Sequence, residues 1–197
     1  SVFDFTNTGS GMWAFAGLQT KLAFNQATSW TQCSMVEVDE GNGTIRCIFC
    51  KDSNSGTRKL WQFRLDSSNF LNFLFGDSAG TLGSLTGTTA VTSQSGKVRT
   101  MCAVRDVAAD TITLYLDGKL EAGPSSDAST GTWQVSDWNA GTANSGDTGL
   151  RWGGVRHIDY FWDRALSAND VQDLELQKYD LFFNSNPNNT LELSILS

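Results

Sequence analysis

The sequence predicts an all-β fold: a jelly-roll β-sandwich of two antiparallel sheets, with one short helix near the C-terminus. Many short segments alternate apolar and polar residues with the period of two that half-buried strands show. Glycine occurs 19 times and proline only twice, which suits many strands joined by tight turns. A helical pattern occurs once, so the alternating long helices of a parallel α/β fold are missing.

The strand pattern is clearest in the middle of the chain. It is seen in residues 44–50, 59–66, 69–77, 98–104 and 111–117. In the second of these segments, Trp61, Phe63 and Leu65 share one face, while the residues between them are polar. The two-residue break Ser67-Ser68 before the next segment predicts a hairpin.

One helix is predicted to begin after Ser167. The side chain of Ser167 is suited to cap the first turn, and Asp170 three residues later completes a capping-box pattern. Val171 and Leu174 then fall on one face of the helix. We expect this helix to be short and to pack over the edge of a sheet.

The chain of 197 residues suits a single domain, and no change of composition divides it. We assign residues 1–180 to the sandwich. Residues 181–197 are assigned to a C-terminal strand or arm of the same domain, because Leu191, Leu193 and Ile195 alternate with polar residues. As an arm, this segment would reach a neighbouring subunit.

The charge of the chain excludes several partners. Its formal net charge is −7, whereas nucleic-acid binding depends on clustered lysine and arginine. An anionic membrane surface is disfavoured for the same reason. No apolar run approaches the roughly 20 residues that span a bilayer. The N-terminus lacks the charged and apolar regions of a signal peptide, although removal of a leader before Ser1 stays open.

The four cysteines are predicted to be free thiols, because a chain of this size does not need disulfides for its stability. Cys102 falls on the face of a strand and is expected to be a small buried residue. Cys47 and Cys50 form a lone C-x-x-C within another strand. Residues three apart on a strand point to opposite faces, so their sulfurs should diverge and hold no zinc.

No catalytic residue is predicted. A retaining glycosidase needs two carboxylates about 5 Å apart. Glu37 and Asp39 share a face of a strand, but the next position on that face is Gly41, where the proton donor should stand. His157 is the single histidine, and no G-x-S-x-G elbow accompanies it. We therefore expect His157 to face outward beside Asp159.

A tryptophan-rich segment, residues 132–153, is the candidate ligand-binding site. Sugars stack on aromatic faces while short polar side chains bind their hydroxyls. The candidate ligand-binding residues are Trp133, Trp138, Asn139, Asp147 and Trp152. The alternative is that these tryptophans close the ends of the core, which the usual burial of tryptophan favours.

Two segments carry motifs of a known family. Residues 111–123, TITLYLDGKLEAG, hold a strand that runs into an Asp-Gly turn. Residues 150–174, LRWGGVRHIDYFWDRALSANDVQDL, hold a glycine strand, a second strand and an R-A-L-S helix start. Both resemble the concanavalin A-like lectin/glucanase superfamily, in particular its laminin G-like (LamG) branch. The resemblance implies the two-sheet sandwich.

The resemblance also implies a non-catalytic structural or binding module, of the kind found as external capsid decoration or fibre proteins of bacteriophage virions. The expected partners are capsid or tail proteins and surface glycans. The protein is expected to lie on the virion surface as a homo-oligomer. Free cysteines fit assembly in a cytoplasm. The alternatives are a secreted carbohydrate-binding module and a glycoside hydrolase of the same fold.

Laminin G-like domains often bind calcium through loop aspartates, so the resemblance allows calcium as a cofactor. Asp127, Asp137 and Asp147 lie in suitable segments. No D-x-D-x-D-G run is present, however, and isolated loop aspartates commonly form turns. We therefore predict no metal ligand and no cofactor.

Overall fold

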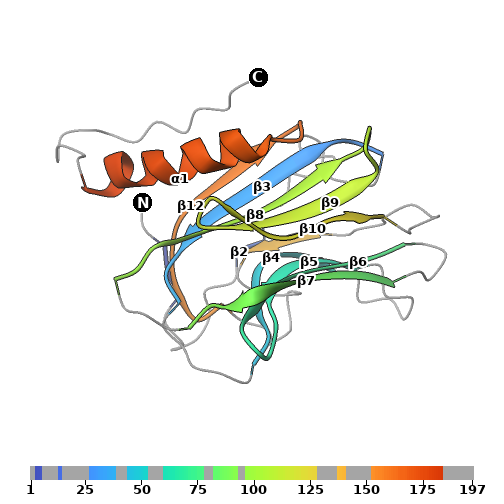
Figure 1. Ribbon diagram of the computed structural model, residues 1–197. Coiled ribbons are helices and arrows are strands. Elements are labelled where there is room, and N and C mark those ends of the chain that lie inside the picture. Colours follow the sequence, from blue (N-terminus) through green and yellow to red (C-terminus); the bar gives the residue numbers. More distant parts are fainter. Residues whose placement is uncertain are drawn as a thin grey trace.

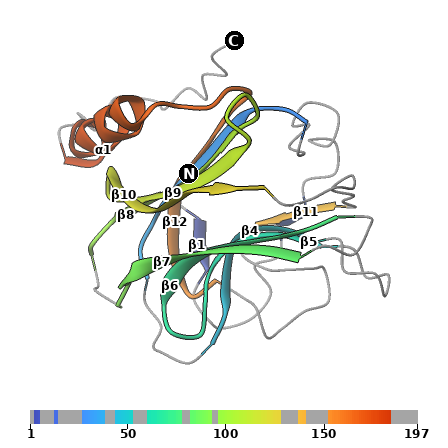
Figure 2. The same cartoon turned by 45° about the vertical axis from the view of Figure 1, so that its right-hand side comes forward.

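A computed structural model describes residues 3–5, 13–14, 27–38, 44–52, 60–77, 82–92, 96–127, 137–140 and 152–183. These residues form two six-stranded sheets and one helix. Figures 1 and 2 show three layers, with the helix α1 over one sheet and the other sheet beneath it. The predicted all-β sandwich is confirmed.

Each sheet is antiparallel throughout its paired strands. The first sheet has the order β1 (Phe3–Phe5), β12 (Gly154–Trp162), β3 (Trp30–Val36), β8 (Arg99–Asp106), β9 (Thr111–Leu116), β10 (Lys119–Ser126). The second sheet has the order β2 (Trp13–Ala14), β11 (Asp137–Ala140), β4 (Arg46–Asp52), β5 (Leu60–Leu65), β6 (Phe70–Gly76), β7 (Leu82–Ala90).

The main core lies between the two sheets and is rich in aromatic rings. Trp30 of the first sheet meets Trp61 of the second edge to face, with ring centroids 5.4 Å apart. Trp61 also meets Phe73 at 5.1 Å. The predicted row on β5 is confirmed, because Trp61, Phe63 and Leu65 are all buried. Aromatic pairs of this kind add about 1 kcal/mol each beyond the area that they bury.

The predicted hairpin between β5 and β6 is also confirmed. Its turn is held by Asp66, whose Oδ1 accepts hydrogen bonds from the backbone N–H groups of Ser68 and Phe70 at 2.8 and 2.9 Å. Asn69 has a φ of 66°, a left-handed conformation that asparagine tolerates better than most residues. The carboxylate of Asp66 is therefore committed to the turn.

The helix α1 (Ala168–Phe183) covers the outer face of the first sheet (Figure 1). Val171 and Leu174 are buried, as the spacing predicts, and pack in a second apolar cluster with residues of β3, β8 and β9. The helix has 16 residues, so it is longer than the pattern indicates and lies over the face rather than the edge. Buried Lys178 anchors its later turns by donating to the carbonyl oxygen of Val98 at 3.0 Å.

The helix end extends past the predicted boundary at residue 180. The segment with Leu191, Leu193 and Ile195 lies outside the described residues, so its assignment as a strand or arm stays a prediction. Within the described part of the chain, α1 is neither long nor apolar enough to cross a membrane.

The predicted capping box forms at the start of α1. Oδ2 of Asp170 accepts hydrogen bonds from the backbone N–H and the hydroxyl of Ser167, both at 2.9 Å. The Asp170 N–H donates to Oγ of Ser167 at 3.2 Å. The Ser167 backbone N–H is the largest cause that lowers the pKa of Asp170 below its ordinary value, since a hydrogen bond stabilises the carboxylate form.

The prediction of free cysteines is wrong: all four are in disulfides. Cys33 and Cys102 are direct partners in the register of β3 and β8, with Cα atoms 4.1 Å apart. Cys47 bonds to Cys50, three residues along β4. A register shift between Cys47 and Phe49 interrupts the alternation there. Such a bulge lets two side chains three positions apart meet, which the period-two argument does not allow.

The two disulfides should contribute unequally to stability. Cys33–Cys102 spans 69 residues and Cys47–Cys50 spans 3, so the loop-closure relation gives about 4 and about 2 kcal/mol. Urea unfolding should show a larger loss of unfolding free energy when the first pair is changed to alanine than when the second pair is. A thiol titration checks that the cysteines are oxidised: four reactive thiols in denatured, unreduced protein would contradict the two disulfides.

The lowered pKa of Asp170 predicts a pH-dependent helix cap. Its stabilisation is fully present above the ordinary value of 3.8 and is lost as the pH falls through the lower folded value. The unfolding free energies of the wild type and Asp170→Asn should therefore differ at neutral pH and converge in strong acid. Asp173→Asn, exposed on the same helix, is the matched control. A wild-type advantage that persists in acid would contradict this origin.

Candidate functional site

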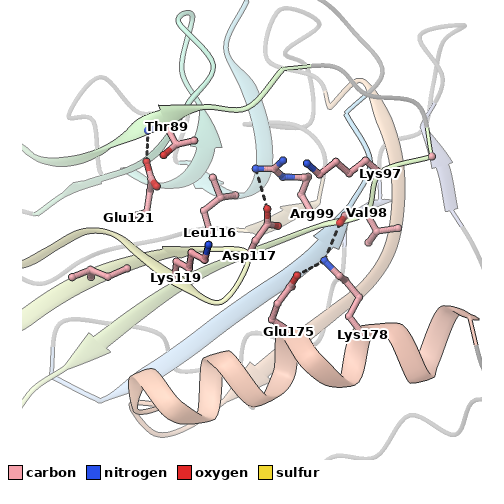
Figure 3. A pocket seen from close by; sticks show the side chains of 12 residues that line it. Thr89, Lys97, Val98, Arg99, Leu116, Asp117, Lys119, Glu121, Glu175 and Lys178 are labelled. Carbon is pink, nitrogen blue, oxygen red and sulfur yellow. Dashed lines mark hydrogen bonds and ion pairs between the residues drawn. The ribbon is translucent and has the colours of Figure 1, made fainter.

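A groove of about 800 Å³ opens where the β9–β10 turn meets α1 and the start of β8. Figure 3 shows its side chains coming from β7, the segment before β8, the β9–β10 hairpin and α1. The groove is lined by Thr89, Gly96, Lys97, Val98, Arg99, Leu116, Asp117, Lys119, Leu120, Glu121, Glu175 and Lys178. We call this site the hairpin groove.

The Asp-Gly turn that the sequence marks positions one wall of the hairpin groove. Asp117 and Gly118 both have positive φ, at 49° and 74°, which is the geometry of a two-residue type I′ hairpin. A Cβ on Gly118 would lie 2.9 Å from the Cβ of Glu175 on α1. Glycine is therefore needed twice over at residue 118, for the turn and for the close approach of the helix.

Ion pairs fix several of the groove's polar side chains. Arg99 Nη2 lies 3.0 Å from Asp117 Oδ2, and the Thr100 N–H donates to Oδ1 of the same carboxylate at 3.1 Å. Lys178 Nζ lies 2.5 Å from Glu175 Oε1 (Figure 3). These groups are held in place before any ligand arrives, which lowers the entropy cost of binding.

The opposite wall is also fixed. Oε1 of Glu121 accepts hydrogen bonds from the backbone N–H groups of Thr88, at 2.5 Å, and Thr89 on β7. Glu121 thereby joins an outer strand of the first sheet to an outer strand of the second. The groove consequently lies between two sheets and a helix that are tied together, rather than on a free loop.

Two lysines at the hairpin groove are exposed and uncompensated. Among the residues that the structure describes, neither Lys97 nor Lys119 has a carboxylate within ion-pair distance. Leu120 adds apolar surface and is 58% exposed. The groove therefore combines free cationic donors, fixed carboxylates and a small apolar surface.

Of the five predicted ligand-binding residues, Trp152 alone has a described side chain. Trp152 is 2% exposed and belongs to the main core cluster, which favours the core interpretation for this residue. Trp138 and Asn139 lie on β11, opposite Lys51 and Cys50 of β4 in the register.

Trp133 and Asp147 lie outside the described residues, so their assignment as ligand contacts stays a prediction.

The carboxylates considered for catalysis and calcium have structural partners where they are described. Glu37 pairs with His157, Oε1 to Nε2 at 2.9 Å, and its Oε2 accepts the Gly96 N–H at 2.8 Å. His157 thus pairs with Glu37, whereas Asp159 pairs with Arg156 at 2.6 Å. A register shift lies between Arg156 and Ile158 on this strand.

Asp39 and Gly41 lie outside the described residues, as does Asp147, and the side chain of Asp137 is not described. Asp127 is buried and pairs with Arg105 at 3.3 Å. Within the described residues, no three His, Cys, Asp or Glu side chains gather as a metal site.

The hairpin groove was not predicted from the sequence. The sequence predicts a strand that runs into the Asp117-Gly118 turn, but other groove residues lie far from this turn along the chain. Lys97 precedes the turn by two strands, β8 and β9, whereas Glu175 and Lys178 follow it on the helix. The pairing of β8 with β9 brings the segment before β8 to the turn, and the packing of α1 over the first sheet brings Glu175 and Lys178 there.

Solved structures share this fold at low sequence identity. The CBM40 domain of Ruminococcus gnavus IT-sialidase, solved bound to α2,3 sialyllactose, superposes with a TM-score of 0.72 at 11% identity, over 89% of this chain and 96% of that one. The SAP-like pentraxin of Limulus polyphemus gives 0.56 at 15% identity, over 76% and 70%. The leech intramolecular trans-sialidase gives 0.66 at 17% identity, over 87% of this chain and 26% of that one.

No curated protein matches the sequence significantly. A family model does match, across residues 13–172. That span contains the Asp-Gly hairpin turn, the strands of both sheets from β2 to β12 and the capped start of α1. The chain therefore belongs to the Laminin_G_3 family of the concanavalin A-like lectin/glucanases superfamily.

Proposed function

We propose that this chain is a non-catalytic glycan-binding module that holds a sugar in the hairpin groove. The observation that carries the proposal is the groove itself, with its fixed polar side chains and its two free lysines. The shared fold with a carbohydrate-binding domain supports the same class of function. The groove's volume of about 800 Å³ is within the usual range for small-ligand sites.

The chemistry of the groove suits a sugar. Sugar hydroxyls both donate and accept hydrogen bonds, so they need partners of both kinds. Lys97 and Lys119 supply donors, and the fixed carboxylates of Asp117 and Glu121 supply acceptor oxygens. Leu120 offers apolar surface to the C–H face of a ring. Hydrogen bonds to charged groups contribute about 1.5–3 kcal/mol each.

A binding role without catalysis has its own support. Glu37 accepts hydrogen bonds from an imidazole and a backbone amide, so its carboxylate is already occupied. The CBM40 structures are of a sialidase's binding domain. Absence of sugar release from a bound glycan is the expected result of an assay for hydrolysis.

The disulfides indicate the kind of compartment in which the module acts. Disulfides form and persist in oxidising compartments and are rare in a reducing cytoplasm. The two disulfides of this chain therefore favour a secreted or surface location. They also remove the free thiols that supported assembly in a cytoplasm.

A homo-oligomeric decoration or fibre protein on a virion is a second candidate. Its support is the resemblance at residues 164–167, whose serine caps α1. Sedimentation with empty capsids tests it: co-sedimentation in the absence of any glycan would favour this role, and no co-sedimentation would oppose it.

A glycan array tests the binding proposal. The wild type should bind a defined set of glycans, and Lys97→Ala with Lys119→Ala should weaken binding at least about tenfold, since charge-assisted hydrogen bonds are lost. Both lysines are exposed, so stability should stay within about 0.5 kcal/mol.

Leu82→Ala is the matched control for that array. Leu82 is 53% exposed on β7 and does not line the groove, so this variant should bind as the wild type does. The absence of any bound glycan, or an equal loss in the control, would overturn the assignment of the groove.

A further inference from the structure

A polar network lies on the second sheet, on the face turned away from the core. Gln62 and Arg64 alternate along β5 with the buried rings of Trp61 and Phe63, so they occupy the opposite face. Asn72 of β6 is the register partner of Arg64. Ser84 and Thr86 of β7 extend the network and are both exposed.

Hydrogen bonds hold the Arg64 guanidinium in one position. Its Nε donates to Asn72 Oδ1 and its Nη1 donates to Gln62 Oε1, both at 2.7 Å. The Asn72 amide nitrogen donates in turn to Ser84 Oγ at 2.9 Å and Thr86 Oγ1 at 2.8 Å. Gln62 and Asn72 are each 3% exposed, whereas Arg64 remains partly exposed.

The charge of Arg64 has no direct counter-ion. Within the described residues, no carboxylate lies within ion-pair distance of this guanidinium, although each of four other arginines has one. Asp66 acts on it only at longer range, and its carboxylate is committed to the β5–β6 turn. Burial lowers the pKa of Arg64, with Asp66 opposing that shift, as expected for a partly desolvated cation without an adjacent carboxylate.

Two of the five N–H donors of the guanidinium are used. Three therefore remain, including both on Nη2. A carboxylate matches the fork geometry of arginine, and the exposed hydroxyls of Ser84 and Thr86 lie beside the network to bind neighbouring hydroxyl groups. We infer that the Arg64 network is an anion-binding site for a hydroxylated carboxylate, such as a sugar acid.

A carboxylate fits this site better than a phosphate. The network holds one cation among neutral amides and hydroxyls, whereas phosphate sites gather several positive or N–H groups. The net charge of −7 also opposes a ligand with two negative charges. The site is separate from the hairpin groove, because no residue of the network lines that groove.

Titration with glucuronate tests the inference directly on the wild-type protein. The side-chain Nε–H resonance of Arg64 should shift and saturate with glucuronate. Methyl glucoside, which lacks the carboxylate, should leave it in place. Inorganic phosphate should bind at least about tenfold more weakly than glucuronate, because a doubly charged anion meets a single cation on a chain of net charge −7.

Arg64→Lys keeps the positive charge but loses the planar fork, so glucuronate binding should weaken at least about tenfold. A thermal scan checks that this variant is folded. If it is not, the shift of the wild-type Arg64 resonance with glucuronate tests the inference alone. Leu176→Ala, 62% exposed on α1 and outside both the network and the groove, should bind glucuronate as the wild type does. Because the Nε–H resonance reports on Arg64 itself, its response separates failure of the Arg64 site from failure of the proposed glycan site.

Any one of three outcomes would overturn the inference. The first is an Arg64 resonance that does not respond to glucuronate, and the second is an equal shift with methyl glucoside. The third is a folded Arg64→Lys variant that binds glucuronate as tightly as the wild type. Phosphate binding equal to or tighter than that of glucuronate would overturn the assignment to carboxylates.

Discussion

The first sheet is the middle layer of the molecule, and its burial on both faces constrains everything around it. All seven residues of β3 are buried, because α1 covers one face and the second sheet covers the other. A strand in this position has no water to satisfy polar groups on either side. Thr31 shows the consequence: its hydroxyl donates to the Arg164 carbonyl at 2.9 Å and accepts the Leu166 N–H at 2.9 Å. The same bonds position the segment that leads into α1, so burial of one strand places the helix.

This layering divides the charged residues into two kinds. The buried arginines of the first sheet are paired, Arg156 with Asp159 at 2.6 Å and Arg105 with Asp127 at 3.3 Å. Burial demands such pairing, since an isolated buried ion costs several kcal/mol. Arg64, on the far face of the second sheet, is held by neutral amides instead. Because the fold leaves the Arg64 cation without an adjacent carboxylate, an external anion gains binding free energy by pairing with it.

The sequence predicts the layers of this fold because each depends on a local pattern. Period-two alternation identifies β5 and β6, and the Ser167–Asp170 capping box identifies the start of α1. The disulfide within β4 could not be predicted in this way, because one extra residue in a strand reverses which side chains share a face. Cys33 and Cys102 required the register of two strands that are distant in the chain. The hairpin groove is harder still, since it exists only after α1 docks. Trp152 illustrates a different limit: composition alone does not distinguish a ring that stacks on a ligand from one that fills a core.

Glu121 has a consequence beyond the groove that it lines. β7 and β10 are the outermost strands at one side of their sheets, and the outer N–H groups of such strands are templates for pairing with another copy of the chain. The carboxylate of Glu121 accepts two of these N–H groups on β7, from Thr88 and Thr89. The side chain of Glu121 thereby blocks part of the exposed edge of β7. It also places a negative charge where an incoming strand would have to pair. The closure of the sandwich at this side thus also protects the protein against self-association into extended β-aggregates.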